Sequence, residues 1–371
     1  MRMIPLSGPT IGEEEKANVM EVMESTMLTN KEGRGRFCRD FEEKVSKFTN
    51  AKHVYAMTSG TAALHASLMA LGIEHGDEVI LPSLTFVATA EVVLHVGAKP
   101  VFADINPETY TIDPQDMKKL FTEKTKAVIP VDLYGLPADL DEIMETAHGH
   151  GVRVVEDAAQ SVGAEYKGRS IGCISDLTCI SLYPSKNITT GEGGLVCTND
   201  GELAERIFRI RNHGETQPYY SDMLGYNFRM SEIHAAIGVA QIDRVRGIVD
   251  SRERNAQHLS SLIGNAGEKT PHVPPDRKHA WHQYTVRLPP ALAEKRAHLM
   301  ERMEARGIAT GVIYKYPIHV MSFYSKFIKR NLPATEQAVK QVLQLPVHQS
   351  LASKEIEFVA QSFKESAKSI S

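Results

Sequence analysis

Strand-like and helix-like segments alternate through the first half of this chain, and this alternation restricts the folds that it can form. Short apolar runs are separated by longer segments with apolar residues at helical spacing. Strands are expected at residues 53–57, 78–82, 100–103, 127–132 and 152–156, with helices up to about 71 and at 85–96, 114–121 and 140–148. Such alternation predicts an α/β fold with a mainly parallel central sheet covered by helices on both faces.

The pattern changes character near residue 246. Other elements are expected as helices at 11–23, 37–48, 201–211, 231–245, 252–263, 291–306 and from 354, and as strands at 178–182, 195–198, 283–288 and 310–314. Gly247 lies just past one of these helices, a position where glycine is common. At 371 residues the chain is long enough for two domains. We therefore predict a large domain at 1–245 and a smaller α+β domain at 246–371.

Three groups of polar residues follow expected strands, at the edge of the sheet where ligands bind. Residues 58–61, Thr-Ser-Gly-Thr, join a strand to a helix, and their amides can bind an anion there. Asp157 ends a very apolar strand, and Lys186 follows another one. Each has a simpler explanation: Ser-Gly-Thr is also a common turn, and Lys186 taken alone reads as a surface lysine.

Together, the three groups suit the cofactor pyridoxal 5′-phosphate (PLP). A partly desolvated lysine is a good Schiff-base nucleophile. A strand-end aspartate can keep the pyridine nitrogen protonated, so that the ring accepts electrons, while the turn holds the phosphate. The order of turn, acid and lysine along the chain is what favours this interpretation over three unrelated residues.

Composition excludes several classes of partner. The net charge of −4 leaves no basic surface for nucleic acid, and no stretch approaches the length of a membrane span. The four cysteines have neither CxxC nor zinc spacing, and no residue set has metal-ligand spacing. The N-terminus lacks an apolar signal core, so we expect a cytoplasmic protein that binds neither nucleic acid nor membrane.

Several motifs in order resemble those of the DegT/DnrJ/StrS family of sugar aminotransferases. They are Pro5-Leu-Ser-Gly-Pro-Thr-Ile-Gly-Glu-Glu-Glu15, Ser59-Gly-Thr-Ala-Ala-Leu64, Glu156-Asp-Ala-Ala-Gln160, Lys186 with Gly-Glu-Gly-Gly at 191–194, Gly225-Tyr-Asn-Phe-Arg-Met230 and Leu345-Pro-Val-His348. The resemblance runs nearly end to end. It implies PLP fold type I, the fold of aspartate aminotransferase, and a homodimer with shared active sites.

The resemblance also implies a role for each residue of the site. Lys186 forms the internal aldimine and moves protons, Asp157 pairs with the pyridinium nitrogen, and Gln160 lies near the ring hydroxyl. The remaining residues bind phosphate (Gly60, Thr61, Ser181), stack on the ring (Phe86), reach the phosphate from the neighbouring subunit (Asn227) or approach the sugar (Arg229, Tyr314). Without the family, Phe86 and Ser181 would read as core residues, Asn227 as a helix cap and Arg229 as a partner of a surface acid.

The function implied is transfer of an amino group from glutamate, yielding 2-oxoglutarate, to a keto group of a nucleotide-linked deoxysugar. Whether that group is at C3 or C4 stays open, although residues 283–286 look slightly more like the C3 branch.

A sugar dehydratase of the same family is a rival, but there histidine replaces the lysine. A silent PLP-binding regulator is a second rival. A dinucleotide oxidoreductase is disfavoured because no G-x-G-x-x-G follows the first strand. We expect sugar choice to depend on residues 26–36 and the C-terminal domain.

Overall fold

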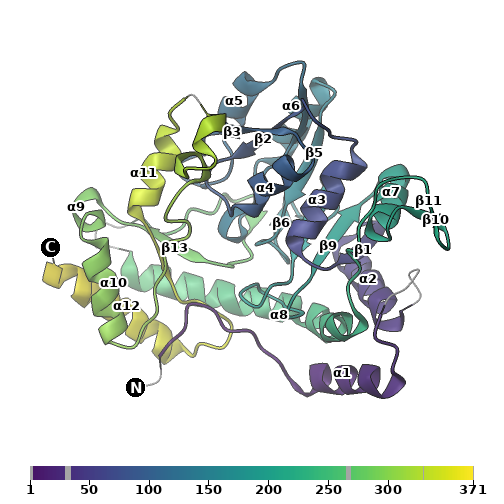
Figure 1. Cartoon of the computed structure of the whole chain (residues 1–371). Coiled ribbons are helices and arrows are strands. Elements are labelled where there is room, and N and C mark those ends of the chain that lie inside the picture. The colour runs from purple at the N-terminus through teal and green to yellow at the C-terminus, as the bar shows by residue number, and fades with distance from the viewer. Residues whose placement is uncertain (1–2, 30–34, 265–268, 329, 371) are drawn as a thin grey trace.

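The computed structural model describes residues 3–29, 35–264, 269–328 and 330–370, and its centre is one seven-stranded sheet (Figure 1). In spatial order its strands are β1 (His53–Met57), β9 (Gly194–Thr198), β8 (Leu177–Ser181), β5 (Arg153–Asp157), β4 (Thr125–Val128), β2 (Glu78–Pro82) and β3 (Lys99–Ala103). The five strands from β8 to β3 pair in parallel, and β9 is antiparallel to both of its neighbours. The predicted α/β fold with a mainly parallel sheet is confirmed.

Helices cover both faces of this sheet, because successive residues of a strand point to opposite sides. Val154 of β5 belongs to one apolar core and the next residue, Val155, to the other. The twelve α-helices in the described residues are α1 (Glu13–Ser25), α2 (Arg36–Thr49), α3 (Gly60–Ala70), α4 (Ala88–His95), α5 (Pro114–Met117), α6 (Leu140–Gly149), α7 (Gly201–Arg211), α8 (Glu232–Ile263), α9 (Pro290–Ala293), α10 (Arg296–Ala305), α11 (Pro333–Gln341) and α12 (Ser353–Ile370). The first core lies under α2, α6 and α8, and the second under α3, α4 and α7.

The helix expected to end before Gly247 does not end there. α8 continues for 32 residues, and Figure 1 shows it as one rod between α1 and α2 at one end and α10 and α12 at the other. Gly247 is a helical residue, and the apolar face of α8 resumes directly with the buried Ile248 and Val249. The expected break is therefore wrong, and the proposed boundary near residue 246 falls inside a helix.

The C-terminal residues build a third apolar core around a two-stranded sheet. β13 (Tyr284–Arg287) pairs antiparallel with β14 (Val342–Leu345), which the sequence pattern did not reveal. The strand expected at 310–314 is absent from the described residues, where only Gly311 bridges to Gln344. The carbonyl of Ile313 instead accepts a hydrogen bond from the Tyr134 hydroxyl, which turns this segment toward the main sheet.

Shorter strands complete the structure: β6 (Glu165–Tyr166), β7 (Arg169–Ser170), β10 (Glu215–Gln217), β11 (Tyr220–Ser221) and β12 (Arg277–Lys278). Of the substrate loop expected at 26–36, residues 30–34 lie outside the described residues. Across the described part of the chain, none of the helices combines the length and the apolar character that crossing a membrane requires.

Alanine substitutions at the two glycines of α8 are expected to change stability in opposite directions, and together they test whether the helix is continuous. A Cβ at the exposed Gly247 has no atom within 4 Å, so Gly247→Ala is expected to stabilise the protein by about 1 kcal/mol through helix propensity. A Cβ at Gly238 would lie 2.8 Å from the buried Phe41 ring, so Gly238→Ala is expected to destabilise by about 1–2 kcal/mol through overpacking. Denaturant unfolding of the two variants measures both changes; destabilisation by Gly247→Ala would contradict a helix that passes through this residue.

Candidate active site

A cavity of about 560 Å³ opens where β1, β2, β5 and β8 end. Its volume lies within the range of small-molecule and cofactor sites. Eight of the ten residues predicted from the sequence line it: Gly60, Thr61, Phe86, Asp157, Gln160, Ser181, Lys186 and Tyr314. Asn227 and Arg229 do not. Residues from four separate strands and from the C-terminal part of the chain thus converge on one cavity.

The N-terminus of α3 forms one wall of the cavity. Ser59 caps the helix by accepting a hydrogen bond from the Ala62 amide at 3.0 Å. The first amides of a helix have no partner within the helix, so those of Gly60 and Thr61 are suited to bind an anion. A Cβ at Gly60 would lie 2.9 Å from that of Ser181, and one at Gly194 would lie 2.3 Å from the Ser59 carbonyl oxygen. The two glycines therefore allow this turn to approach the strand ends.

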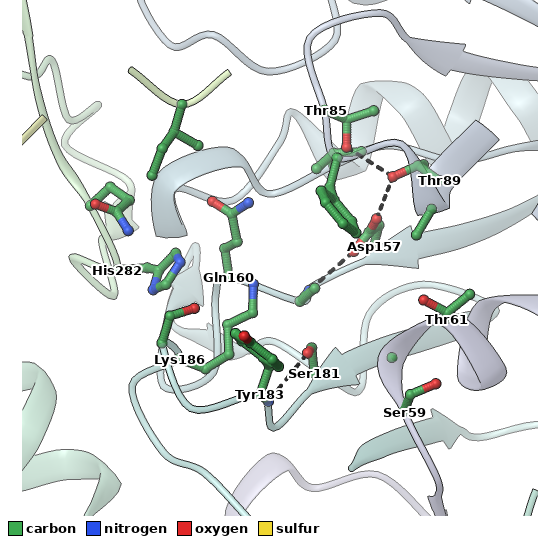
Figure 2. A pocket seen from close by; sticks show the side chains of 18 of the residues that line it. Ser59, Thr61, Thr85, Thr89, Asp157, Gln160, Ser181, Tyr183, Lys186 and His282 are labelled. Carbon is green, nitrogen blue, oxygen red and sulfur yellow. Dashed lines mark hydrogen bonds between the residues drawn. The ribbon is translucent and has the colours of Figure 1, made fainter. Parts of the chain in front are cut away.

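Asp157 is the buried acid of the cavity, at the end of β5. Its Oδ2 accepts a hydrogen bond from the Thr89 hydroxyl at 2.8 Å, and its Oδ1 accepts the Ala159 amide at 3.2 Å (Figure 2). The Thr89 hydroxyl is in turn 2.8 Å from that of Thr85. Burial raises the pKa of Asp157, while these hydrogen bonds and the positive charge of Lys186 oppose the rise. A protonated ring nitrogen would supply the opposite charge that this carboxylate lacks.

Lys186 follows β8 in a tight turn, and its own amide donates to the Tyr183 carbonyl at 2.9 Å. Its side chain reaches into the cavity toward Asp157 (Figure 2). Burial lowers the pKa of Lys186 to about 8, against the opposing effect of the Asp157 charge. A larger fraction of its amine is therefore neutral near neutral pH than in an ordinary lysine, and the neutral amine is the form that attacks an aldehyde.

Gln160, Tyr314 and Phe86 border the cavity beyond the two charges. Gln160 accepts the Tyr134 amide at 2.8 Å and donates to the Tyr314 hydroxyl at 3.1 Å. The Phe86 ring lies 6.0 Å from that of Tyr314, yet 55% of Phe86 is exposed. An exposed aromatic face at a cavity wall suits stacking against a flat ring.

Asn227 and Arg229 lie outside the cavity but next to its anion-binding wall. The Phe228 carbonyl between them accepts the Thr58 amide at 2.9 Å, and Met57 bridges to Arg229. Asn227 is exposed, which leaves its side chain accessible to another molecule. The Nε of Arg229 is buried and has no hydrogen-bond partner in the described residues.

Among the cavity residues that sequence reasoning missed, Thr89 and His282 bear most on its chemistry. Thr89 lies one helical turn after Phe86, and a hydroxyl at that spacing could have been noticed as a partner for the strand-end acid. His282 lines the cavity although it comes from the C-terminal part of the chain. No local signal marks it, because other parts of the chain bring it there.

A pair of buried acids lies directly behind the cavity. Asp132 accepts hydrogen bonds from the Ala138 amide at 2.9 Å and the Ser161 hydroxyl at 2.7 Å. Glu156 accepts the Thr178 hydroxyl at 2.9 Å through one oxygen and interacts with Asp132. Burial and the nearby Asp132 charge raise the pKa of Glu156 well above its usual range. Glu156 is therefore the protonated member of the pair, which avoids three ionised acids beside one another.

PLP fits this cavity, because each of its parts meets a matching feature. The amides of α3 could bind the phosphate, Phe86 could stack on the ring, Asp157 could pair with the pyridine nitrogen, and Lys186 could bond to the aldehyde carbon. The fold and these residues define a PLP-dependent aminotransferase of fold type I. The chain belongs to the DegT/DnrJ/EryC1/StrS aminotransferase family, whose model matches residues 9–364.

Individual relatives are similar over almost their whole length. The chain is 37% identical over 360 residues to a GDP-perosamine synthase of Caulobacter vibrioides, covering 96% of each protein. It is also 37% identical over 359 residues to a pleiotropic regulatory protein of Geobacillus stearothermophilus, covering 95% of each. Similarity at this level therefore includes both an enzyme and a protein named for regulation.

Solved structures agree with the fold. The S. venezuelae protein DesV, solved with a ketimine intermediate, superposes with a TM-score of 0.93 at 33% identity over 99% of both chains. The Streptococcus pneumoniae protein Spr1654, solved in a PLP form, gives a TM-score of 0.93 at 28% identity over 100% of both chains.

Substitutions of Glu156 test its protonation. Glu156→Gln keeps a neutral group that can donate to Asp132, so its unfolding free energy is expected to stay within about 1 kcal/mol of wild type. Glu156→Ala leaves the Thr178 hydroxyl without its acceptor and opens a cavity, and is expected to lose about 3 kcal/mol. Denaturant unfolding at pH 7 measures both; equal losses would mean that Glu156 is ionised.

Proposed function

We propose that this protein transfers an amino group from glutamate to a keto group, at C3 or C4, of a nucleotide-linked deoxysugar. The observation that carries the proposal is the convergence of Lys186, Asp157 and the N-terminus of α3 on one cavity, where burial also lowers the pKa of Lys186. The family and the Caulobacter GDP-perosamine synthase support a nucleotide-sugar acceptor. Residues 283–286 leave us with a slight preference for C3.

When bound, PLP supplies an electron sink that stabilises negative charge on the carbon next to the transferred nitrogen. The residues of this chain would provide the rest. Lys186 attaches the cofactor through its Nζ and, once released, carries a proton between the carbons on either side of that nitrogen. Asp157 keeps the ring nitrogen protonated, because its carboxylate is buried and its hydrogen bonds hold it in place. Gln160 is our candidate for the ring hydroxyl.

The phosphate would be held by Gly60, Thr61 and Ser181, and the ring covered by Phe86. Tyr314 closes the side away from the phosphate and is a candidate for sugar contact. Its hydroxyl is fixed by Gln160, so any sugar contact would be set at a constant distance from the ring.

We also infer a homodimer in which each cavity is completed by its partner. The exposed Asn227 and the half-buried Arg229 flank the anion-binding wall without entering the cavity of their own chain. From that position Asn227 would reach the phosphate, and Arg229 the substrate, of the neighbouring subunit.

Two rival functions are less well supported. In the dehydratases of the family histidine stands in place of the lysine, whereas Lys186 is present here. A silent regulator gains some support from the Geobacillus relative. A regulator that holds PLP could use the same lysine, so only the two half-reactions distinguish it from an aminotransferase. The following experiment separates the three.

The purified protein is expected to convert from its PLP form to its pyridoxamine form when glutamate is added, and a nucleotide-linked 3-keto or 4-keto sugar should reverse the change. Absorbance spectroscopy follows both half-reactions across a small panel of sugars. Lys186→Ala is the matched control: borohydride should fix PLP covalently to the wild-type protein and not to this variant, as mass spectrometry would detect.

Failure of glutamate to change the wild-type spectrum would reject the donor, and failure of every sugar would reject the acceptor class. PLP fixed to Lys186→Ala by borohydride would reject the assignment of Lys186. A regulator would bind PLP and fail both half-reactions.

A mixing experiment tests the shared site. Lys186→Ala and Asn227→Ala are each expected to be nearly inactive as homodimers. After subunit exchange, activity should recover to about a quarter of wild type, because half of random dimers are mixed and each of these has one intact site. Activity no higher than that of the two parents would show that Asn227 serves its own chain.

A further inference from the structure

His282 is a buried histidine of the active-site cavity, and one of its two ring nitrogens is left unsatisfied by the described residues. Only 5% of it is exposed, it lines the cavity, and its buried Nδ1 has no hydrogen-bond partner in the described residues. Figure 2 shows His282 beside Lys186 and Gln160, on the side away from Ser59 and Thr61. A buried polar nitrogen without a partner costs free energy, so a ligand in the cavity is expected to supply one.

The backbone around His282 is fixed from three directions. The buried Arg252 of α8 donates to the carbonyls of Trp281 at 3.0 Å and His282 at 3.3 Å. The Asn187 side chain, next to Lys186, donates to the Ala280 carbonyl at 2.7 Å. On the third side the Gln283 amide donates to the Tyr134 carbonyl at 3.0 Å. The segment that carries His282 is thus tied to the residue after Lys186 by a hydrogen bond, and fixed placement of this kind is expected of a residue that binds a ligand.

The close packing of this segment supports the same conclusion. Gly135 has a φ of +104°, and a Cβ there would lie 3.0 Å from the His282 amide nitrogen and from the Gln160 carbonyl oxygen. The segment carrying His282 therefore lies directly on the backbone that positions Gln160. The imidazole has little freedom to turn away from the cavity.

We propose that His282 is a further substrate-binding residue, whose imidazole hydrogen-bonds a hydroxyl or carbonyl oxygen of the sugar beside Lys186. This inference rests on the proposed function. The anion-binding turn takes the phosphate end of the cofactor, so the opposite end, where His282 lies, is left for the substrate. Sugar hydroxyls both donate and accept, as does a neutral imidazole.

The charges around His282 favour a neutral partner. Burial and the positive charges of Lys186, Arg252 and neighbouring groups lower the pKa of His282 well below its usual range, so the ring stays neutral. Among the described lining residues of its own chain, His282 has no arginine beside it, and Arg229, proposed for this cavity, would enter from the neighbouring subunit. A carboxylate of the amino donor would call for a cation such as a bidentate arginine, whereas a neutral ring suits the sugar.

The test separates the two half-reactions in the holoenzyme. In His282→Phe, which keeps a planar ring without nitrogens, kcat/KM for the keto-sugar is expected to fall about tenfold or more. The glutamate half-reaction should stay within about twofold of wild type, because His282 makes no contact with the donor. His282→Gln, which retains polar groups, should recover part of the loss.

His65→Phe is the matched control. It removes a buried imidazole of α3 that packs against His95 and Phe228 outside the cavity lining, and should leave both half-reactions unchanged. Thermal unfolding and the PLP spectrum check that each variant folds and holds its cofactor.

Equal loss of both half-reactions in His282→Phe would overturn the inference, since His282 would then act on the cofactor or on Lys186. Unchanged kinetics in a wild-type enzyme that accepts keto-sugars would also overturn it. If wild type itself accepts no sugar, the proposed function fails first, which is a different observation from a variant that equals an active parent.

Discussion

The structure depends on two opposite charges held out of water at the ends of neighbouring strands. Asp157 lies at the end of β5, and Lys186 follows β8. Burial raises the pKa of Asp157 and lowers that of Lys186, which favours the neutral form of each side chain. Each charge partly offsets the cost of burying the other, yet no hydrogen bond is recorded between them in the described residues. A cavity that keeps them apart leaves both available to a ligand of mixed charge placed between them. The hydroxyl of Thr89 and the protonated Glu156 support that arrangement from behind.

Much of this could be predicted from the sequence, because it depends on local patterns. The apolar strands, the helix that starts at Gly60 and the residues directly after strands determine where Asp157, Lys186 and the anion-binding turn lie. Parallel strands place their carboxyl ends on one edge, so residues far apart in the chain were expected to meet. The positions of Gly60 and Gly194 also follow, since only a glycine lets the Ser59 turn approach β8 and β9 so closely.

What could not be predicted depends on contacts between distant segments. His282 has no signal in its own neighbourhood; it enters the cavity because Arg252, Asn187 and Tyr134 hold its backbone. The expected strand at 310–314 does not form. Instead, the Ile313 carbonyl accepts a hydrogen bond from Tyr134, and the Tyr314 hydroxyl accepts one from Gln160. Gly247 suggests a helix end because glycine has a low helix propensity. The helix continues past it because Ile248 and Val249 are buried in the core.

The length of α8 has a consequence for the way the molecule responds as a whole. Ala235 and Val245 of this helix belong to a core of the main sheet, while Ala256 and Leu259 belong to the core of the C-terminal residues. Unfolding of α8 would expose apolar surface of both cores at once. Neither core is therefore expected to unfold readily while the other stays folded. The shared helix thereby couples the two cores, and a change that unwinds α8 is expected to weaken both of them.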